Sequence, residues 1–162
     1  MTYYYKNMPS PVGILKLVVS NKGLAAILWE NENPKRVPLG LCLEDNNYPL
    51  LLETEKQLND YFSGTRTQFS LKLDFGGTQF QQKVWHALTS IPFGETRSYQ
   101  QIAQQIGHPK AVRAVGAANG KNPISIVAPC HRVIGANGKL TGFAGGLTIK
   151  AYLLNMEKTR KL

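Results

Sequence analysis

Cys130-His131-Arg132 is the part of the sequence best suited to nucleophilic chemistry. A cysteine attacks as the thiolate, and a neighbouring base or cation favours that form by lowering the pKa of the thiol. Pro129 restricts the backbone just before the cysteine, and apolar residues flank the segment on both sides. A single cysteine is also often a small buried side chain without reactivity. The residues alone therefore leave two interpretations of Cys130, a nucleophile and a structural residue.

The second cysteine, Cys42, lies between Leu41 and Leu43 without a basic neighbour, which indicates an inert side chain. Two cysteines in 162 residues are too few for a disulfide framework, or for a four-ligand zinc site without help from the three histidines. We therefore expect no metal, no cofactor and a reduced, cytoplasmic protein. The sequence has no stretch of the ~20 apolar residues that cross a bilayer, and its first residues lack the apolar core of a signal peptide. We expect no membrane partner.

The net charge of +9 belongs to the second half of the chain. Residues 1–74 carry eight basic and eight acidic side chains, whereas residues 75–162 carry eleven basic and two acidic ones. No acidic residue occurs from Thr96 to Met156, yet this stretch has a normal apolar content and is expected to fold. A one-sided positive field suits a polyanion, and nucleic acid is the commonest polyanion in the cytosol. The alternative is a charge that serves solubility and binds no partner.

The elements of the first half are predicted to form a small antiparallel sheet of three strands with one helix. Val12–Val19 and Gly23–Trp29 are apolar and β-branched around a short turn, which is typical of a β-hairpin. Pro49 opens a stretch with apolar residues at helical spacing, and Gly64 closes it. Alternating apolar and polar residues at 69–73 predict the third strand. The fold class is therefore α+β.

Asp74-Phe75-Gly76-Gly77 is the best candidate linker, because the charge balance also changes there. It divides the chain into an N-terminal β-rich supporting domain, residues 1–74, and a C-terminal domain, residues 75–162. The C-terminal domain is predicted to be mostly helical and similar to a winged helix. Thr78 caps its first helix, and Ser98 opens a second helix that Gly107 ends. A third helix over Pro109–Asn119 completes a helix-turn-helix.

The helix expected at 109–119 has a slim outer face. Residues at helical spacing form its inward face: Ala111, Ala114, Val115 and Ala118. Basic and small residues form its outer stripe: Lys110, Arg113, Ala117 and Lys121. An ordinary helix is ~10–12 Å across and the minor groove of B-DNA ~6 Å wide, so only a slim helix enters a widened minor groove. The pattern favours contacts to backbone and shape over sequence readout. Alternatively, the small residues serve close packing between helices.

Pro129-Cys130-His131-Arg132-Val133 resembles the active-site signature of the O6-alkylguanine-DNA alkyltransferases, also called methylated-DNA–protein-cysteine methyltransferases. Further segments resemble this family in the same order and at its usual spacing: Ser98–Ala103, Pro109–Gly116, Asn122-Pro123, Gly145–Leu147 and Lys150–Glu157. The resemblance covers the C-terminal half almost continuously from Phe80. The first half resembles the family only in its β-rich layout and size. An ordered series of segments is far more specific than a single five-residue motif.

The resemblance implies a DNA repair protein that acts once per molecule. The thiolate of Cys130 takes the alkyl group from O6 of a damaged guanine and becomes a thioether that is not regenerated. His131 takes the proton of the thiol, through a bound water in members of the family, and Glu157 orients and charges the imidazole, as in a triad with cysteine in place of serine. Methyl is the expected group, and O4-alkylthymine is a second lesion that the sequence leaves open.

The resemblance also implies how double-stranded DNA with alkylated bases is bound. The target base is flipped out of the duplex, because a stacked base cannot reach a buried thiolate. Tyr99 acts near the 3′ phosphate of the target, and Arg113 fills the vacated place in the stack. Lys110, Ala111 and Ala117 belong to a helix placed in the minor groove. The partner is DNA alone, bound by a monomer.

The remaining site residues implied by the resemblance hold or line the pocket for the base. Asn122 is the hinge that ties the helix-turn-helix to the active-site segment. Val133 and the loop at 142–146 line the guanine pocket. Phe143-Ala144 stand where some members of the family have Tyr-Ser, so residue 144 offers only its backbone N–H to the guanine O6.

Two other classes of protein account for part of these observations. A helix-turn-helix regulator or damage-recognition protein, with a structural Cys130, would bind DNA without chemistry. A cysteine hydrolase fits the Cys–His–acid set, yet it explains neither the slim basic helix nor the lack of acidic residues around the site.

Overall fold

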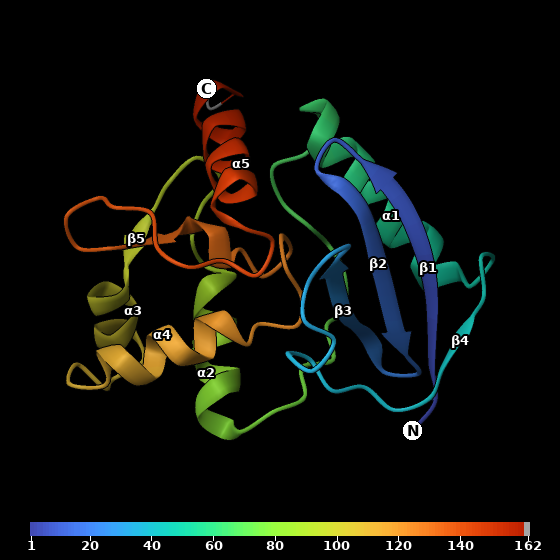
Figure 1. Ribbon diagram of the computed structural model, residues 1–162, viewed down its shortest axis with the longest axis horizontal. Helices are drawn as coiled ribbons and strands as arrows, with labels where there is room; N and C mark the ends of the chain where they lie inside the picture. The colour runs from blue at the N-terminus through green and yellow to red at the C-terminus, as the bar shows by residue number, and fades with distance from the viewer. Residues whose placement is uncertain (161–162) are drawn as a thin grey trace. The chain divides into compact units, whose positions relative to one another are not determined.

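The computed structural model describes residues 1–160 and divides the chain into two compact units, Met1–Gly76 and Gly77–Leu162. The first unit is a β-sheet with one helix, and the second is mostly helical, so the α+β class is confirmed (Figure 1). No helix among the described residues is long and apolar enough to span a membrane.

The sheet of the first unit has four strands, so the expected three-stranded antiparallel sheet is wrong. The strands are β1 (Tyr3–Ser10), β2 (Gly13–Ser20), β3 (Gly23–Trp29) and β4 (Cys42–Glu44), in the order β3-β2-β1-β4. β1 pairs antiparallel with β2 and parallel with β4. The pattern in β1 is weak because Met8 is its one buried residue. This segment is a strand because it pairs with two neighbours, and its own residue pattern does not indicate that pairing.

The expected hairpin around residues 20–23 is confirmed as β2–β3, with Ser20 opposite Gly23. Gly23 has φ of +155°, and a Cβ there would lie 2.6 Å from the carbonyl oxygen of Lys72, so glycine is required. Lys72 approaches because Leu24 N–H donates to its carbonyl over 2.8 Å. The strand expected at 69–73 is reduced to an isolated bridge between Leu73 and Leu24 on the edge of β3.

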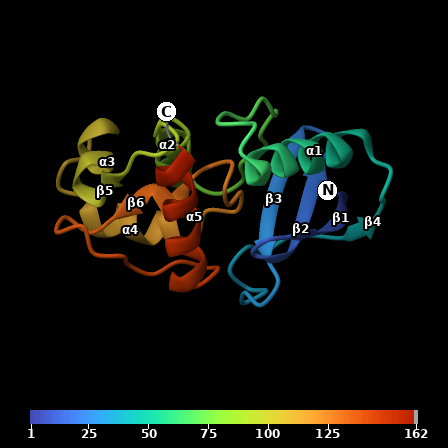
Figure 2. The same cartoon turned by 90° about the horizontal axis from the view of Figure 1, so that it is seen from above.

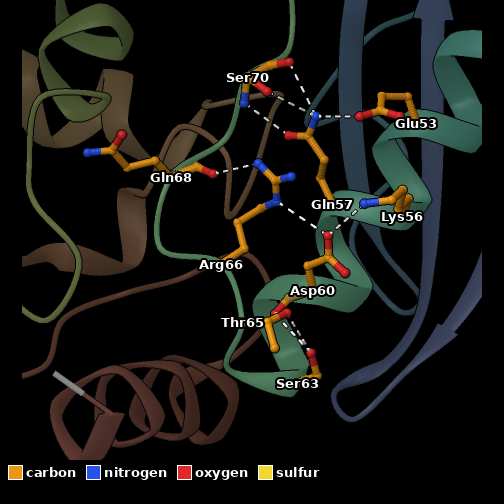
Figure 3. Close-up of polar contacts among 9 residues, drawn as sticks. All are labelled: Glu53, Lys56, Gln57, Asp60, Ser63, Thr65, Arg66, Gln68 and Ser70. Carbon is orange, nitrogen blue, oxygen red and sulfur yellow. Dashed lines mark hydrogen bonds and ion pairs between the residues drawn. The ribbon is translucent and has the colours of Figure 1, made fainter. Parts of the chain in front are cut away.

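Helix α1 (Pro49–Ser63) covers one face of the sheet and contacts β1, β2 and β3 (Figure 2). Leu51, Leu58 and Tyr61 are fully buried on this face, and Gly64 ends the helix in the left-handed conformation, both as predicted. Figure 3 shows Gln57 at the centre of a polar cluster. Its amide oxygen accepts from Ser70 N–H over 2.9 Å, which ties the segment after α1 back to the helix.

Three helices of the second unit pack against one another: α2 (Gln79–Leu88), α3 (Tyr99–Gln105) and α4 (Val112–Gly120). Thr78 and Ser98 cap α2 and α3, as predicted. The capping box expected at Ser98 is present, and Thr78 forms one as well. The indole N–H of Trp85 donates to the carbonyl of Ala118 over 2.7 Å and joins α2 to α4. The remaining elements are β5 (Arg97–Ser98), the 3₁₀ helix η1 (Cys130–Arg132), β6 (Val133–Ile134) and α5 (Leu147–Arg160).

The helix expected at 109–119 begins later, at Val112. Ala111 N–H donates to His108 O over 2.9 Å, so the residues around Pro109 form a turn and Lys110 precedes the helix. The inward face also differs, because Ala114 is exposed while Asn119 is buried beside Val115 and Ala118. Proline suits a turn as well as a first helical position, and local sequence does not separate the two.

Candidate active site

Cys130 opens the 3₁₀ helix η1, and its side chain is only 5% exposed. The chain reaches it through two tight turns. Ile126 has φ of +73°, and Val127 N–H donates to Ser125 O over 2.9 Å, which makes a γ-turn with a strained, β-branched central residue. Pro129, at φ −80° and ψ 70°, lies at the centre of an inverse γ-turn in which Cys130 N–H donates to Ala128 O. These two turns fix the backbone that leads to Cys130 and so define the position of its thiol.

Asn122 fastens this segment to the end of α4, which supports the expected hinge. Its amide nitrogen donates to Ala128 O over 2.7 Å, and its amide oxygen accepts from Ile124 N–H over 3.1 Å. The side chain is fully buried, so water cannot replace these contacts.

We expect Asn122→Ala to lower the free energy of unfolding by about 2–4 kcal/mol, because it leaves a buried carbonyl and a buried N–H without these partners. Urea denaturation followed by tryptophan fluorescence measures the change. Asn137→Ala is the matched control, since Asn137 lies in an exposed turn, and it should cost less than about 0.5 kcal/mol. Equal losses for the two variants would show that Asn122 is no hinge.

His131 and Glu157 meet inside the second unit. His131 Nε2 lies 2.7 Å from Glu157 Oε2, and both side chains are essentially inaccessible to solvent. Arg132 holds the same carboxylate by two hydrogen bonds, Nε to Oε1 at 2.8 Å and Nη2 to Oε2 at 2.9 Å. The backbone N–H of Gly94 donates to Oε1 over 3.3 Å. His131 and Glu157, which were predicted to interact, are thus in contact, and Arg132 binds the same buried carboxylate.

The pKa values of this group fix where its protons lie. Burial opposes the ionisation of Glu157, but the hydrogen bonds and charges of His131 and Arg132 outweigh it and hold the pKa of the carboxyl far below its usual range. Burial lowers the pKa of His131, against the raising effect of Glu157, so the imidazole is neutral at pH 7. An ionised carboxylate only accepts, so the proton lies on Nε2 and Nδ1 keeps its lone pair. Nδ1 is buried without a hydrogen-bond partner among the described residues, as a base awaiting a proton requires.

Helix α5 supplies a second polar side chain that the sequence analysis did not assign to the site. Lys150 lies seven residues before Glu157, on the same buried face of the helix, and is fully inaccessible to solvent. Its ammonium group donates to Val133 O over 2.6 Å. Burial lowers the pKa of Lys150, and the charge of Cys130 acts in the opposite direction, so the two groups attract when both are ionised. The sequence does contain a signal for Lys150, because its spacing of seven residues places it on the same helix face as Glu157.

Tyr99, the first residue of α3, lies close to the segment that follows Cys130. The short parallel pair β5–β6 sets Arg97 opposite Val133 and Ser98 opposite Ile134, which brings the first residue of α3 close to the segment after Cys130. The hydroxyl of Tyr99 shares a hydrogen bond of 2.5 Å with the hydroxyl of Thr141. Tyr99 is half-buried, as are Phe143 and Ala144 in the following loop, whereas Val133 is fully buried.

The predicted nucleic-acid contacts lie at the surface of the helix-turn-helix. Lys110, Arg113, Ala117 and Lys121 are all exposed, and Ala111 is half-buried. The exposed alanine at position 114 makes the outer face of α4 even slimmer than the sequence pattern predicted. Within the described residues, no group of three or more histidine, cysteine, aspartate or glutamate side chains could hold a metal ion.

The fold and the site define a class of protein: a helix-turn-helix unit that carries a buried cysteine beside a histidine–carboxylate pair. The chain belongs to the 6-O-methylguanine DNA methyltransferase family. Residues 79–159 match the DNA binding domain of that family, and residues 3–75 match its ribonuclease-like domain.

Named relatives resemble the chain over nearly its whole length. It is 47% identical to the methylated-DNA–protein-cysteine methyltransferase of Methanosarcina acetivorans over 95% of this chain and 97% of that protein. The protein of the same name from Mycobacterium leprae is 46% identical over 97% of this chain and 93% of its own. A crystal structure of Mycobacterium tuberculosis OGT in complex with DNA superposes with a TM-score of 0.89 at 46% identity, covering 99% of this chain and 94% of that one.

Proposed function

We propose that this protein repairs alkylated DNA by moving an alkyl group, methyl above all, from O6 of guanine to Sγ of Cys130. The names of its relatives state methylated DNA as the donor and a protein cysteine as the acceptor. One observation carries the assignment of the acceptor: Cys130 is buried and directly precedes a histidine whose imidazole is oriented by a buried carboxylate. Cys42, the other cysteine, stands in the β-sheet unit, and its contact is to a backbone carbonyl, Gly40 O.

The transfer needs no co-reactant. His131 Nδ1 accepts the proton of the thiol, and the thiolate attacks the alkyl carbon in line with the bond to O6. The imidazolium that forms is stabilised by the Glu157 carboxylate on the opposite nitrogen. The S–C bond forms as the C–O bond breaks, the bonding pair stays on O6, and the guanine takes up the proton that left the thiol, which returns His131 to its neutral form. The thioether has no good leaving group, so the protein is consumed with the lesion.

The side chain of Lys150 adds a positive charge near the reacting sulfur. Its ammonium group and Cys130 attract each other electrostatically, which favours the thiolate over the thiol. The same ammonium group donates to Val133 O, so it also fixes the wall of the proposed base pocket next to the nucleophile.

The basic face of α4 is proposed to lie in the minor groove of duplex DNA. Arg113 is exposed amid small residues, so it is placed to fill the gap that the flipped base leaves in the stack. Lys110 and the flanking backbone then contact phosphates, with Ala111 and Ala117 allowing a close approach. The hydroxyl of Tyr99 is hydrogen-bonded to Thr141, so it would exchange this contact for one to the phosphate or the base when DNA binds.

The pocket for the flipped guanine is proposed to lie between Val133 and the loop that carries Phe143 and Ala144. Lys150 Nζ holds the carbonyl groups of Val133 and Thr141, at 2.6 and 3.4 Å, so both walls are anchored to α5. Residue 144 lacks a hydroxyl, and any hydrogen bond from it to O6 comes from the backbone N–H.

The test is a transfer experiment with duplex DNA that contains O6-methylguanine with a radioactive methyl group. We expect label to move to the protein and to saturate at one equivalent per protein molecule. Parallel duplexes with O6-benzylguanine and O4-methylthymine define the range of lesions. A protein that bound these duplexes without taking up label would instead be a helix-turn-helix recognition module.

A further inference from the structure

Arg132 makes hydrogen bonds both to the carboxylate of Glu157 and to the backbone carbonyl of Ile91. Arg132 is 5% exposed, and besides its two hydrogen bonds to Glu157 its guanidinium donates from Nη1 to Ile91 O over 2.7 Å. Glu157 Oε2 therefore receives both Arg132 Nη2 and His131 Nε2, at 2.9 and 2.7 Å. A planar guanidinium that grips both carboxylate oxygens fixes the rotation of the carboxylate as well as its charge.

We propose that Arg132 is a positioning residue of the transfer reaction, which acts through Glu157 to keep His131 uncharged with its proton on Nε2. The proposal rests on the alkyl transfer to Cys130 and deepens it. Arg132 touches neither the sulfur nor the base in this role, because its hydrogen-bonding groups are directed at Glu157 and Ile91.

The balance of buried charge around Glu157 depends on Arg132. A buried carboxylate needs one compensating positive charge, and without Arg132 the nearest group able to provide it is His131, by taking up a proton. An imidazolium cannot accept the proton of the thiol, so the base would be lost. With Arg132 present the carboxylate is already compensated, and a further proton on His131 would be an excess buried charge.

The charged groups around His131 act on its pKa in opposite directions. Glu157 and Lys150 face it from α5, Arg132 from η1, and Cys130 precedes it in the chain. Burial lowers the pKa of His131 most, Glu157 raises it, and the charges of Arg132 and Lys150 lower it further. Glu157 is thus the acid that favours the imidazolium, and Arg132 is the cation bound directly to that acid.

A merely structural role for Arg132 makes a different prediction. Its hydrogen bond to Ile91 O and its position 5.8 Å from the ring centroid of Phe93 would then matter for stability alone. Replacement would lower the midpoint of unfolding and leave the proton of His131 where it is. The state of the imidazole therefore separates the two roles.

The experiment is ¹⁵N NMR of the His131 ring between about pH 5.5 and pH 8.5, with the transfer rate measured at the same pH values. In the unmodified protein we expect a ring that is neutral at pH 7, with its proton on Nε2. Arg132→Gln should give a ring that gains a proton within this range, and a transfer rate that falls about tenfold for each pH unit below the new midpoint. Arg132→Lys keeps the charge and should keep the ring neutral. Arg97→Gln, which removes a half-buried arginine paired with Glu95, is the control and should change neither result.

The proposal is overturned if His131 in the unmodified protein is an imidazolium at pH 7 or carries its proton on Nδ1. An unchanged titration in Arg132→Gln has the same consequence. If Arg132→Gln does not fold, the unmodified protein and Arg132→Lys still decide, because a charged His131 in either contradicts the proposal. Failure of the proposed alkyl transfer is seen separately, as an unmodified protein that takes up no label whatever its NMR spectrum.

Discussion

Cys130→Ala is expected to take up no alkyl group from O6-methylguanine DNA, while its affinity for the same duplex stays within about threefold of the unmodified protein. The thiol is the one group in the proposed reaction that forms a bond to the transferred carbon, so no neighbour replaces it. The affinity is retained because the exposed side chains of α4, Arg113 among them, supply the contacts to DNA. Alanine removes a single sulfur atom from a well-packed position and costs about 1 kcal/mol of stability.

Intact-mass spectrometry after incubation with the lesion duplex, together with filter binding at fixed salt, measures both quantities. Cys42→Ala is the matched control, since Cys42 lies in the short strand β4 and is half-buried. It should gain one alkyl group at the normal rate. An adduct on Cys130→Ala, or its absence from Cys42→Ala, would assign the acceptor to the wrong residue.

The fold could be predicted where local chemistry decides the structure. Thr78 and Ser98 cap their helices because each has a glutamine three residues later that completes the capping box. The hairpin β2–β3 follows from its short turn. Strand β1 could not be predicted, because it is half-exposed along most of its length and is defined by pairing with β2 and β4. Pairing between distant segments leaves little trace in a single sequence.

The geometry of the site shows the same division. If Cys130 and His131 lay in a β-strand, their side chains would point to opposite faces. The segment is instead a 3₁₀ helix with three residues per turn, so His131 and Arg132 both reach Glu157. The resemblance to a family supplied Glu157 as a candidate. The contact of Arg132 with Glu157 could not be predicted from the sequence, because the two residues lie 25 positions apart.

Glu157→Gln is expected to lower the free energy of unfolding by about 3–5 kcal/mol and to slow methyl transfer by about 10²–10⁴. An amide cannot accept from Arg132 on both of its polar atoms, so a buried guanidinium is left without its counter-charge. The same change removes the carboxylate that stabilises the imidazolium of His131 after it takes the proton of the thiol. Stability and rate therefore fall together.

The expected loss of stability depends on pH in a defined direction. The pKa of Glu157 is lowered in the folded protein, so its contribution is complete above the unfolded pKa and is lost only as the pH falls through the folded one. The difference between Glu157→Gln and the unmodified protein should thus be constant from pH 8 to about pH 5 and shrink only in stronger acid. Glu95→Gln is the control, because the ion pair of Glu95 with Arg97 is partly exposed and is worth less than about 1 kcal/mol. Denaturant unfolding and single-turnover kinetics measure the two effects, and a Glu157→Gln protein as stable and as fast as Glu95→Gln would refute the buried carboxylate as the group that orients His131.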